Sequence, residues 1–234
     1  MLDSYRIFGE NLKSISFDSK KVVNTINSHS YVLAKSDLEF HEALRSSDIL
    51  LPDGIGIVWA EYFLTGRRLR KIAGYDLFLS LMKEVNWKRG SVFFLGASQA
   101  TLDRIKQRCS KEYPNVSVAI YSPPFKESFS NEDNTKMCNL VSSFKPDILF
   151  VGMTAPKQEK WLHDHLDSLE FTIASCIGAV FDFYGGNVQR PHRLFEKFHL
   201  EWLGRLIKEP KRLWKRNLSV PLFLKDLLIN ILRR

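Results

Sequence analysis

The sequence predicts an α/β fold: a Rossmann-like, mostly parallel sheet with flanking helices, followed by a basic helical C-terminal appendage. Two observations predict this class. Short runs rich in β-branched and aromatic residues alternate with helix-like stretches up to residue 189, which is typical of parallel strands joined by helical crossovers. Beyond that point the pattern changes to basic amphipathic segments. We therefore expect an α/β domain at 1–189 and an appendage at 190–234.

The elements are assigned from the apolar runs and the helical spacing between them. Strands are expected at 21–26, 48–51, 91–95, 116–121, 147–152 and 171–177. Helices are expected at 38–46, 55–64, 75–86, 99–112, 132–143 and 157–166. Each connection between strands then contains at least one helix, as parallel pairing requires. A Ser-Pro-Pro sequence at 122–124, followed by polar residues to 134, predicts a mobile loop.

Composition excludes several classes of protein. With 44% hydrophobic and 12% aromatic residues, 234 residues are enough for a packed core. No apolar stretch is long enough to span a membrane and no signal peptide is recognised, so we expect a cytosolic protein. The cysteines are far apart in the sequence, which argues against a disulfide framework and a zinc site. Six unclustered histidines and the lack of an Asp-x-Asp pair after a strand predict no metal site.

The positive charge is concentrated at the C-terminal end. The net charge is +8, and residues 190–234 contain 12 Lys and Arg against 4 Asp and Glu. Phe195, Phe198, Trp202 and Leu206 recur there at spacings of three and four residues, which predicts an apolar helical stripe among basic residues. Such a segment is typical of a helix attracted to an anionic membrane surface. A helical cap packed on the domain is a compatible interpretation.

Polar residues and glycines follow the predicted strands. Because ligands bind at the carboxyl ends of strands in such sheets, these positions predict a crevice, although turns and helix caps use the same residue types. The candidates are Thr25, Asn27, Asp53, Gly54, Gly96, Gly152, Thr154 and Gly178.

Asp53 is the strongest candidate for a catalytic group. It follows a strand within Pro-Asp-Gly-Ile-Gly, where its carboxylate can accept a proton or cap the next helix. Trp59 stands where a dinucleotide fingerprint needs its third glycine, which counts against a nucleotide-binding oxidoreductase.

Two further segments carry polar groups. Residues 152–159 end in Lys157, Gln158 and Glu159 at a predicted helix start, which can hold a diphosphate or sugar hydroxyls, or can be an ordinary capped turn. Residues 178–186 place Asp182 in an aromatic run, which is either core or a sugar-stacking platform.

Six ordered blocks of this chain resemble the WecG/TagA/CpsF family of bacterial glycosyltransferases. They are Thr-Ile-Asn at 25–27, Pro-Asp-Gly-Ile-Gly at 52–56, Ala-Gly-Tyr-Asp-Leu at 73–77, Phe-Leu-Gly-Ala at 94–97, Ala-Pro-Lys-Gln-Glu at 155–159 and Leu-Glu-Trp-Leu at 200–203. The resemblance implies inverting, metal-independent transfer of N-acetylmannosamine, its uronic acid or a hexose from a UDP-sugar to an undecaprenyl-diphosphate-linked saccharide. It implies no cofactor, and products for wall teichoic acid, enterobacterial common antigen or exopolysaccharide.

The resemblance also assigns roles by position. Asp53 matches the proposed general base, and Thr25, Asn27 and Gln158 match residues around donor and acceptor. Basic residues of the tail match those thought to reach the lipid diphosphate: Arg205, Arg212, Lys215 and Arg216. The remaining expected substrate contacts are Gly54, Lys71, Gly96, Asp182 and Arg190.

The chain departs from the family pattern at three places. Lys71 replaces the usual Arg, and Pro-His at 191–192 and Pro-Pro-Phe at 123–125 replace family turns, so the sugar is not assigned. The expected partners are a UDP-sugar, the lipid-linked acceptor, an anionic membrane at the inner face of the cell membrane, and a second copy in a homo-oligomer. Nucleic acid is not expected, because leucine-rich stripes interrupt the basic tail; binding to it would be salt-sensitive.

Overall fold

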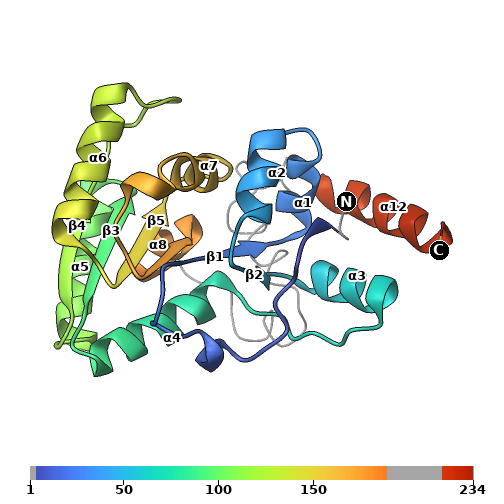
Figure 1. Ribbon diagram of the computed structural model, residues 1–234, viewed down its shortest axis with the longest axis horizontal. Helices are drawn as coiled ribbons and strands as arrows, with labels where there is room; N and C mark the ends of the chain where they lie inside the picture. Colours follow the sequence, from blue (N-terminus) through green and yellow to red (C-terminus); the bar gives the residue numbers. More distant parts are fainter. Residues whose placement is uncertain (1–3, 189–217, 234) are drawn as a thin grey trace.

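The computed structural model describes residues 4–188 and 218–233 (Figure 1). The predicted boundary after residue 189 and most of the predicted appendage lie outside these residues.

Six parallel strands form a single sheet in the order β2-β1-β6-β5-β3-β4. The strands are β1 (Lys21–Ile26), β2 (Ile49–Pro52), β3 (Ser91–Gly96), β4 (Ser117–Tyr121), β5 (Ile148–Gly152) and β6 (Ile173–Cys176). Each coincides with a predicted strand to within a few residues, and the predicted α/β class is confirmed.

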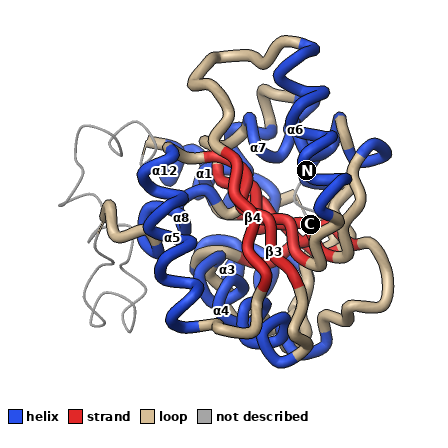
Figure 2. The backbone as a smooth tube through the Cα atoms, turned by 90° about the vertical axis from the view of Figure 1, so that its left-hand side faces the viewer, coloured by secondary structure: helices blue, strands red, loops and turns tan. Residues whose placement is uncertain are grey.

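Helices cover both faces of the sheet (Figure 2). They are α1 (Ser28–Ala34), α2 (Leu38–Arg45), α3 (Ile55–Thr65), α4 (Gly74–Trp87), α5 (Gln99–Glu112), α6 (Asn131–Phe144), α7 (Lys157–Asp164), α8 (Gly178–Tyr184) and α12 (Ser219–Leu232). Two short 3₁₀ helices are η2 (Leu12–Ser14) and η3 (Leu166–Ser168). Helices α4, α5 and α8 pack on one face, and α6 and α7 pack on the other.

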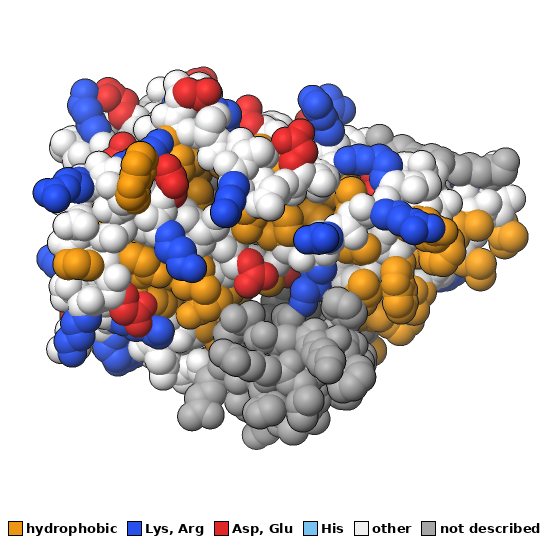
Figure 3. All heavy atoms as spheres, turned by 90° about the horizontal axis from the view of Figure 1, so that it is seen from below, with side chains coloured by type: hydrophobic (Ala, Val, Ile, Leu, Met, Phe, Trp, Pro, Cys, Tyr) orange, Lys and Arg blue, Asp and Glu red, His pale blue; other side chains and the backbone are white. Residues whose placement is uncertain are grey.

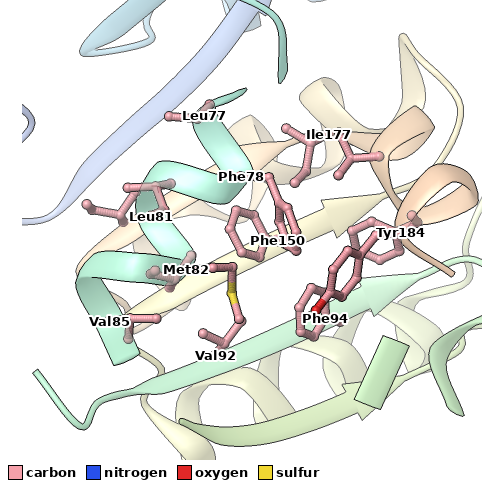
Figure 4. Close-up of a cluster of buried hydrophobic side chains, with 14 of the residues drawn as sticks. Leu77, Phe78, Leu81, Met82, Val85, Val92, Phe94, Phe150, Ile177 and Tyr184 are labelled. Carbon is pink, nitrogen blue, oxygen red and sulfur yellow. The ribbon is translucent and has the colours of Figure 1, made fainter. Parts of the chain in front are cut away.

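The core beneath α4 is rich in aromatic side chains (Figure 4). Phe94 and Phe150 from neighbouring strands stack with ring centroids 5.5 Å apart, and Phe78 approaches Tyr184 to 4.7 Å. Apolar residues recur along α4 every three or four positions, so one side of the helix is buried against the sheet. This packing fixes the start of α4 at the carboxyl edge of the strands.

Helices α1 and α8 were not among the predicted elements. Both are seven residues long, so the apolar periodicity that identifies longer helices is weak in them. In α8, Val180, Phe181 and Tyr184 are buried. The core interpretation of this aromatic run is therefore confirmed.

The last described helix is part of the folded body. Phe223 of α12 is 1% exposed and meets Tyr31 of α1 edge to face at 5.3 Å. Lys35 forms an ion pair with Asp226. For this segment the structure therefore matches the interpretation of a helical cap packed on the domain. None of the helices in the described residues is both long enough and apolar enough to cross a bilayer.

Candidate active site

The carboxyl ends of β1 and β2 bring several predicted site residues together. Thr25 pairs with Leu51, and Ile26 pairs with Pro52. The Asp53 N–H continues this ladder by donating to the Ile26 carbonyl oxygen at 2.8 Å. Thr25, Asn27, Asp53 and Gly54 therefore emerge at one edge of the sheet, as the parallel register requires.

Gly54 separates the Asp53 carboxylate from helix α3. Its φ of +115° is a conformation that residues with a Cβ rarely adopt, and it occupies the N-cap position of α3. The N-cap residue of α3 is therefore Gly54, and Asp53 is the residue before it. A Cβ on Gly54 would lie 3.9 Å from the Asn27 Cβ, so the two turns are in contact.

Asn27 organises the start of α1. Its Oδ1 accepts hydrogen bonds from the N–H groups of His29 and Ser30, both at 3.0 Å. The hydrogen bonds recorded for the Asn27 side chain in the described residues all use Oδ1. These bonds hold the Asn27 side chain at the strand end, beside the Gly54 turn.

The segment before α4 closes the same side of the crevice. The Ile72 N–H donates to the Pro52 carbonyl oxygen at 3.0 Å, which places the neighbouring Lys71 beside the Asp53 turn. A Cβ on Gly74 would lie 4.0 Å from Thr25 Cγ2 and 3.6 Å from Ile177 Cγ2. The ends of β1, β2 and β6 therefore meet at the start of α4.

A cavity adjoins this segment. It has a volume of about 290 Å³ and is lined by Phe8, Gly9, Glu10, Asn11, Arg68, Arg70 and Ile72. A larger hollow of about 560 Å³ lies along α6 and contains none of the predicted site residues. The predicted site residues do not line the smaller cavity either, although its Ile72 donates to the Pro52 carbonyl oxygen at the end of β2.

Gln158 connects two loops of the site. Its side chain is buried, and its Oε1 accepts from the N–H groups of Met153 at 3.0 Å and Gly178 at 3.2 Å. Its Nε2 donates to Glu159 at 2.7 Å. The Gln158 amide was expected to contact substrate. In the described residues it instead joins the turn after β5 to the turn after β6.

Two glycines allow these turns to pack backbone against backbone. A Cβ on Gly96 would lie 2.3 Å from the Gly152 carbonyl oxygen, and one on Gly178 would lie 2.2 Å from that of Met153. The Ala97 N–H donates to the Gly152 carbonyl oxygen at 2.8 Å. The floor of the crevice therefore has no room for side chains at these positions.

Asp182 lies on the far side of this floor. It is half-buried on α8, and its carboxylate accepts from Asn187 Nδ2 at 3.3 Å. The same Nδ2 donates to Thr101 Oγ1 at 2.8 Å, which ties α8 to α5. Asp182 and Gly96 thus belong to the β3 side of the crevice, and Asp53 belongs to the β2 side.

The tail residues expected to contact substrate lie outside the described part of the chain. They are Arg190, Arg205, Arg212, Lys215 and Arg216.

Asn24 was missed by the sequence analysis. It is 2% exposed, accepts from the Cys176 N–H at 3.1 Å and donates to Ser47 Oγ at 3.0 Å. Pairing between β1 and β6 ends at Val22 and Ala174, so the Asn24 amide replaces the ladder where the strands separate. Asparagine is disfavoured inside an apolar strand. Its presence at position 24 was the feature of the sequence that could have identified Asn24 as a structural residue.

Lys157 is directed away from the turn it was expected to serve. Its Nζ lies 3.6 Å from the centroid of the Phe129 ring and donates to the Lys126 carbonyl oxygen. Burial lowers the pKa of its ammonium group. Lys157 therefore holds the 122–130 loop against α7.

The cysteine thiols of the described residues are all buried. All three cysteines are free and buried, as expected. Burial raises the pKa of Cys109 to about 12 and that of Cys176 well above its usual range. Among residues 4–188 and 218–233, no three His, Cys, Asp or Glu side chains are grouped as metal ligands.

Comparison with known proteins points to one family. Residues 5–234 match the family described as Glycosyl transferase WecG/TagA/CpsF family. An N-acetylglucosaminyldiphosphoundecaprenol N-acetyl-beta-D-mannosaminyltransferase of Bacillus subtilis (strain 168) is 34% identical over 200 residues, which cover 86% of this chain and 76% of that protein. A Bacillus spizizenii protein of the same name is 31% identical over 223 residues, covering 94% and 84%. One from Staphylococcus aureus (strain MW2) is 27% identical over 183 residues, covering 78% and 70%.

Proposed function

Because the chain belongs to the WecG/TagA/CpsF family of glycosyl transferases, we propose that it adds N-acetylmannosamine to an undecaprenyl-diphosphate-linked N-acetylglucosamine. The donor is a UDP-sugar, the anomeric centre is inverted and no metal takes part. The names of the relatives support the sugar and the acceptor. The observation that carries the proposal is the contact between the Asp53–Gly54 turn and Asn27 at the carboxyl edge of the sheet.

Asp53 acts as the general base in this reaction. Its carboxylate accepts the proton of the acceptor hydroxyl, whose oxygen attacks the anomeric carbon from the face opposite UDP. The new carbon–oxygen bond forms as the bond to the diphosphate breaks, and UDP leaves with the electron pair. The half-buried position of Asp53 admits a hydroxyl and keeps the carboxylate at a fixed strand end.

The other residues bind and orient the substrates. Asn27 Nδ2 and Thr25 Oγ1 contact sugar or diphosphate oxygens, while Gln158 holds the two turns that form the floor. Lys71 and Arg190 supply positive charge where the leaving diphosphate gains negative charge. Gly54, Gly96 and Asp182 line the crevice.

The basic tail brings the enzyme to its lipid-linked acceptor. Arg205, Arg212, Lys215 and Arg216 bind the acceptor diphosphate, and the enzyme lies at the inner face of the cell membrane. Their charge complements both the diphosphate and an anionic leaflet.

An assay with purified components tests the proposal. UDP-N-acetylmannosamine and undecaprenyl-diphosphate N-acetylglucosamine should give a lipid-linked disaccharide, with or without EDTA. Asp53→Asn should fold normally and lower turnover by roughly a hundredfold or more, because the general base is lost.

The control for this variant is Asp164→Asn, since Asp164 is an exposed carboxylate on α7. It should retain full turnover. Near-normal turnover of Asp53→Asn would remove Asp53 from its role, and loss of transfer with EDTA would contradict metal independence.

A further inference from the structure

Large apolar side chains are exposed together on α3. Trp59 is 52% exposed, Tyr62 42% and Phe63 57%. They lie on the outward side of the helix, because Ile57, Ala60 and Leu64 on the opposite side are buried in the core. The surface of a soluble protein rarely exposes three large aromatic side chains within two helical turns. Such a patch indicates an interaction site.

Helix α12 adds a second apolar face next to the first. It packs against α1 and α3 through Phe223 and Leu227, and its outward side carries leucines. Those at least 48% exposed are Leu218, Leu222, Leu224, Leu228 and Leu232. Figure 3 shows hydrophobic side chains gathered at this end of the molecule, with basic side chains beside them. We refer to the outward sides of α3 and α12 together as the α3–α12 face.

The charges around the α3–α12 face are positive. The sequence Arg-Arg-Leu-Arg-Lys at 67–71 follows α3 directly, and Lys225 and Arg233 lie on and just after α12. Each helix contains one acidic residue, and both are paired: Glu61 with Arg67 at 2.8 Å, and Asp226 with Lys35. Arg68 also lies over the Tyr62 ring, 5.7 Å from its centroid.

This combination selects a lipid surface over a protein partner. Tryptophan and tyrosine are favoured at the level of lipid head groups, leucine and phenylalanine enter the acyl boundary, and arginine and lysine pair with anionic head groups. A second copy of this chain would bring the same positive charges together, which disfavours association through this face.

We propose that the α3–α12 face of the folded body docks on an anionic lipid bilayer. The inference deepens the proposed function and rests on it in one respect, because a lipid-linked acceptor gives the docked enzyme its substrate. It goes beyond attraction through the basic tail, because α3 belongs to the sheet domain and α12 packs on that domain.

Docking through α3 sets the height of the catalytic carboxylate above the membrane. Asp53 and Gly54 directly precede α3, and Trp59 follows Ile55, the first residue of α3, by roughly 6 Å along the helix axis. The base is therefore held near the head groups, where the diphosphate of a lipid-linked acceptor resides. The aromatic side chains act as positioning residues.

Vesicle binding by the full chain tests the proposal. Vesicles of phosphatidylglycerol mixed with phosphatidylcholine are compared with vesicles of phosphatidylcholine alone, by flotation. The double variant Trp59→Gln/Phe63→Gln should bind the anionic vesicles with an affinity lower by a factor of about ten or more. The control Trp87→Gln/Phe125→Gln removes aromatic side chains that are 78% and 108% exposed elsewhere, and should bind like the wild type.

Activity measurements separate this proposal from the proposed function. With a water-soluble, short-chain acceptor the Trp59/Phe63 variant should turn over normally, and with the undecaprenyl acceptor in vesicles it should be about tenfold slower or more. If neither the wild type nor any variant transfers sugar, the proposed function is wrong. The vesicle-binding measurement still tests the docking proposal in that case.

Two results would overturn the docking proposal. One is unchanged vesicle binding by the Trp59/Phe63 variant when its circular dichroism matches the wild type. The other is a change of oligomeric state: the wild type is a dimer, the variant is a monomer, and both bind vesicles equally. That result would show that the α3–α12 face is a contact between two copies of the chain.

Discussion

At the scale of single residues, the site depends on polar groups that are held by other parts of the site. Asp53 keeps its place because its own N–H extends the β1–β2 ladder. Gln158 and Asn24 are buried amides that bind backbone N–H groups of neighbouring turns and strands. A buried amide without partners would destabilise the fold, so these contacts fix the turns as well as the side chains.

The buried thiols allow a prediction at this scale. Since the pKa of Cys109 is raised from 9.0 to about 12, its thiolate fraction near neutral pH falls about a thousandfold. N-ethylmaleimide should therefore label none of the three cysteines of the native protein at pH 8 and all of them in denaturant. Mass spectrometry gives the number of labels, and rapid labelling of the native protein would contradict the burial.

At the scale of elements, the strand ends and the turns after them form the floor of the crevice. A Cβ on Gly96 at the end of β3 would meet the Gly152 backbone, and one on Gly178 at the start of α8 would meet the Met153 backbone. A Cβ on Gly152 at the end of β5 would meet the Phe181 ring. Gln158 on α7 accepts hydrogen bonds from the turns after β5 and β6 and joins them. Close backbone contacts and the Gln158 hydrogen bonds therefore fix these turns relative to one another.

A Cβ at the end of β3 should disrupt this floor. Gly96→Ala combines a φ of +124° with a contact of 2.3 Å to a carbonyl oxygen, so the free energy of unfolding should fall by about 3 kcal/mol or more. Gly66→Ala is the matched control, because Gly66 has a φ of +76° and no atom within 4 Å of its Cβ position. It should cost about 1–2 kcal/mol. Urea denaturation measures both, and equal losses would contradict the role of close packing.

At the scale of the whole molecule, the C-terminal helix is joined to the β1–β2 end of the sheet domain. Helix α12 contributes Phe223 and Leu227 to the cluster that contains Tyr31 of α1 and Ile57 of α3. Deleting residues 190–234 therefore removes core as well as tail. Loss of transfer after such a deletion would not by itself identify a membrane role.

Truncating a single core side chain of α12 tests its contribution to the fold. Phe223→Ala should lower the free energy of unfolding by about 3–5 kcal/mol, because it leaves a cavity against Tyr31. Leu232→Ala, at a side chain that is 77% exposed, should change it by less than about 0.5 kcal/mol. Thermal unfolding compares the two, and equal stability would show that α12 is not part of the core.

The sequence by itself determined the α/β class, all six strands and most helices, because apolar runs and helical periodicity are local properties of the chain. It also placed Thr25, Asn27, Asp53 and Gly54 at or just after the ends of strands that must end at one edge. It missed α1 and α8, which are too short for a clear period, and Asn24, whose partners are distant in the chain.

The tertiary structure decided the strand order, which places Asp53 beside β2 and Gly96 beside β3, and the engagement of Gln158 by two turns. It also decided which apolar side chains of α3 and α12 stay outside the core. Burial and hydrogen bonding between distant segments depend on how the elements pack, and an apolar residue has the same letter in the sequence whether it faces the core or the solvent.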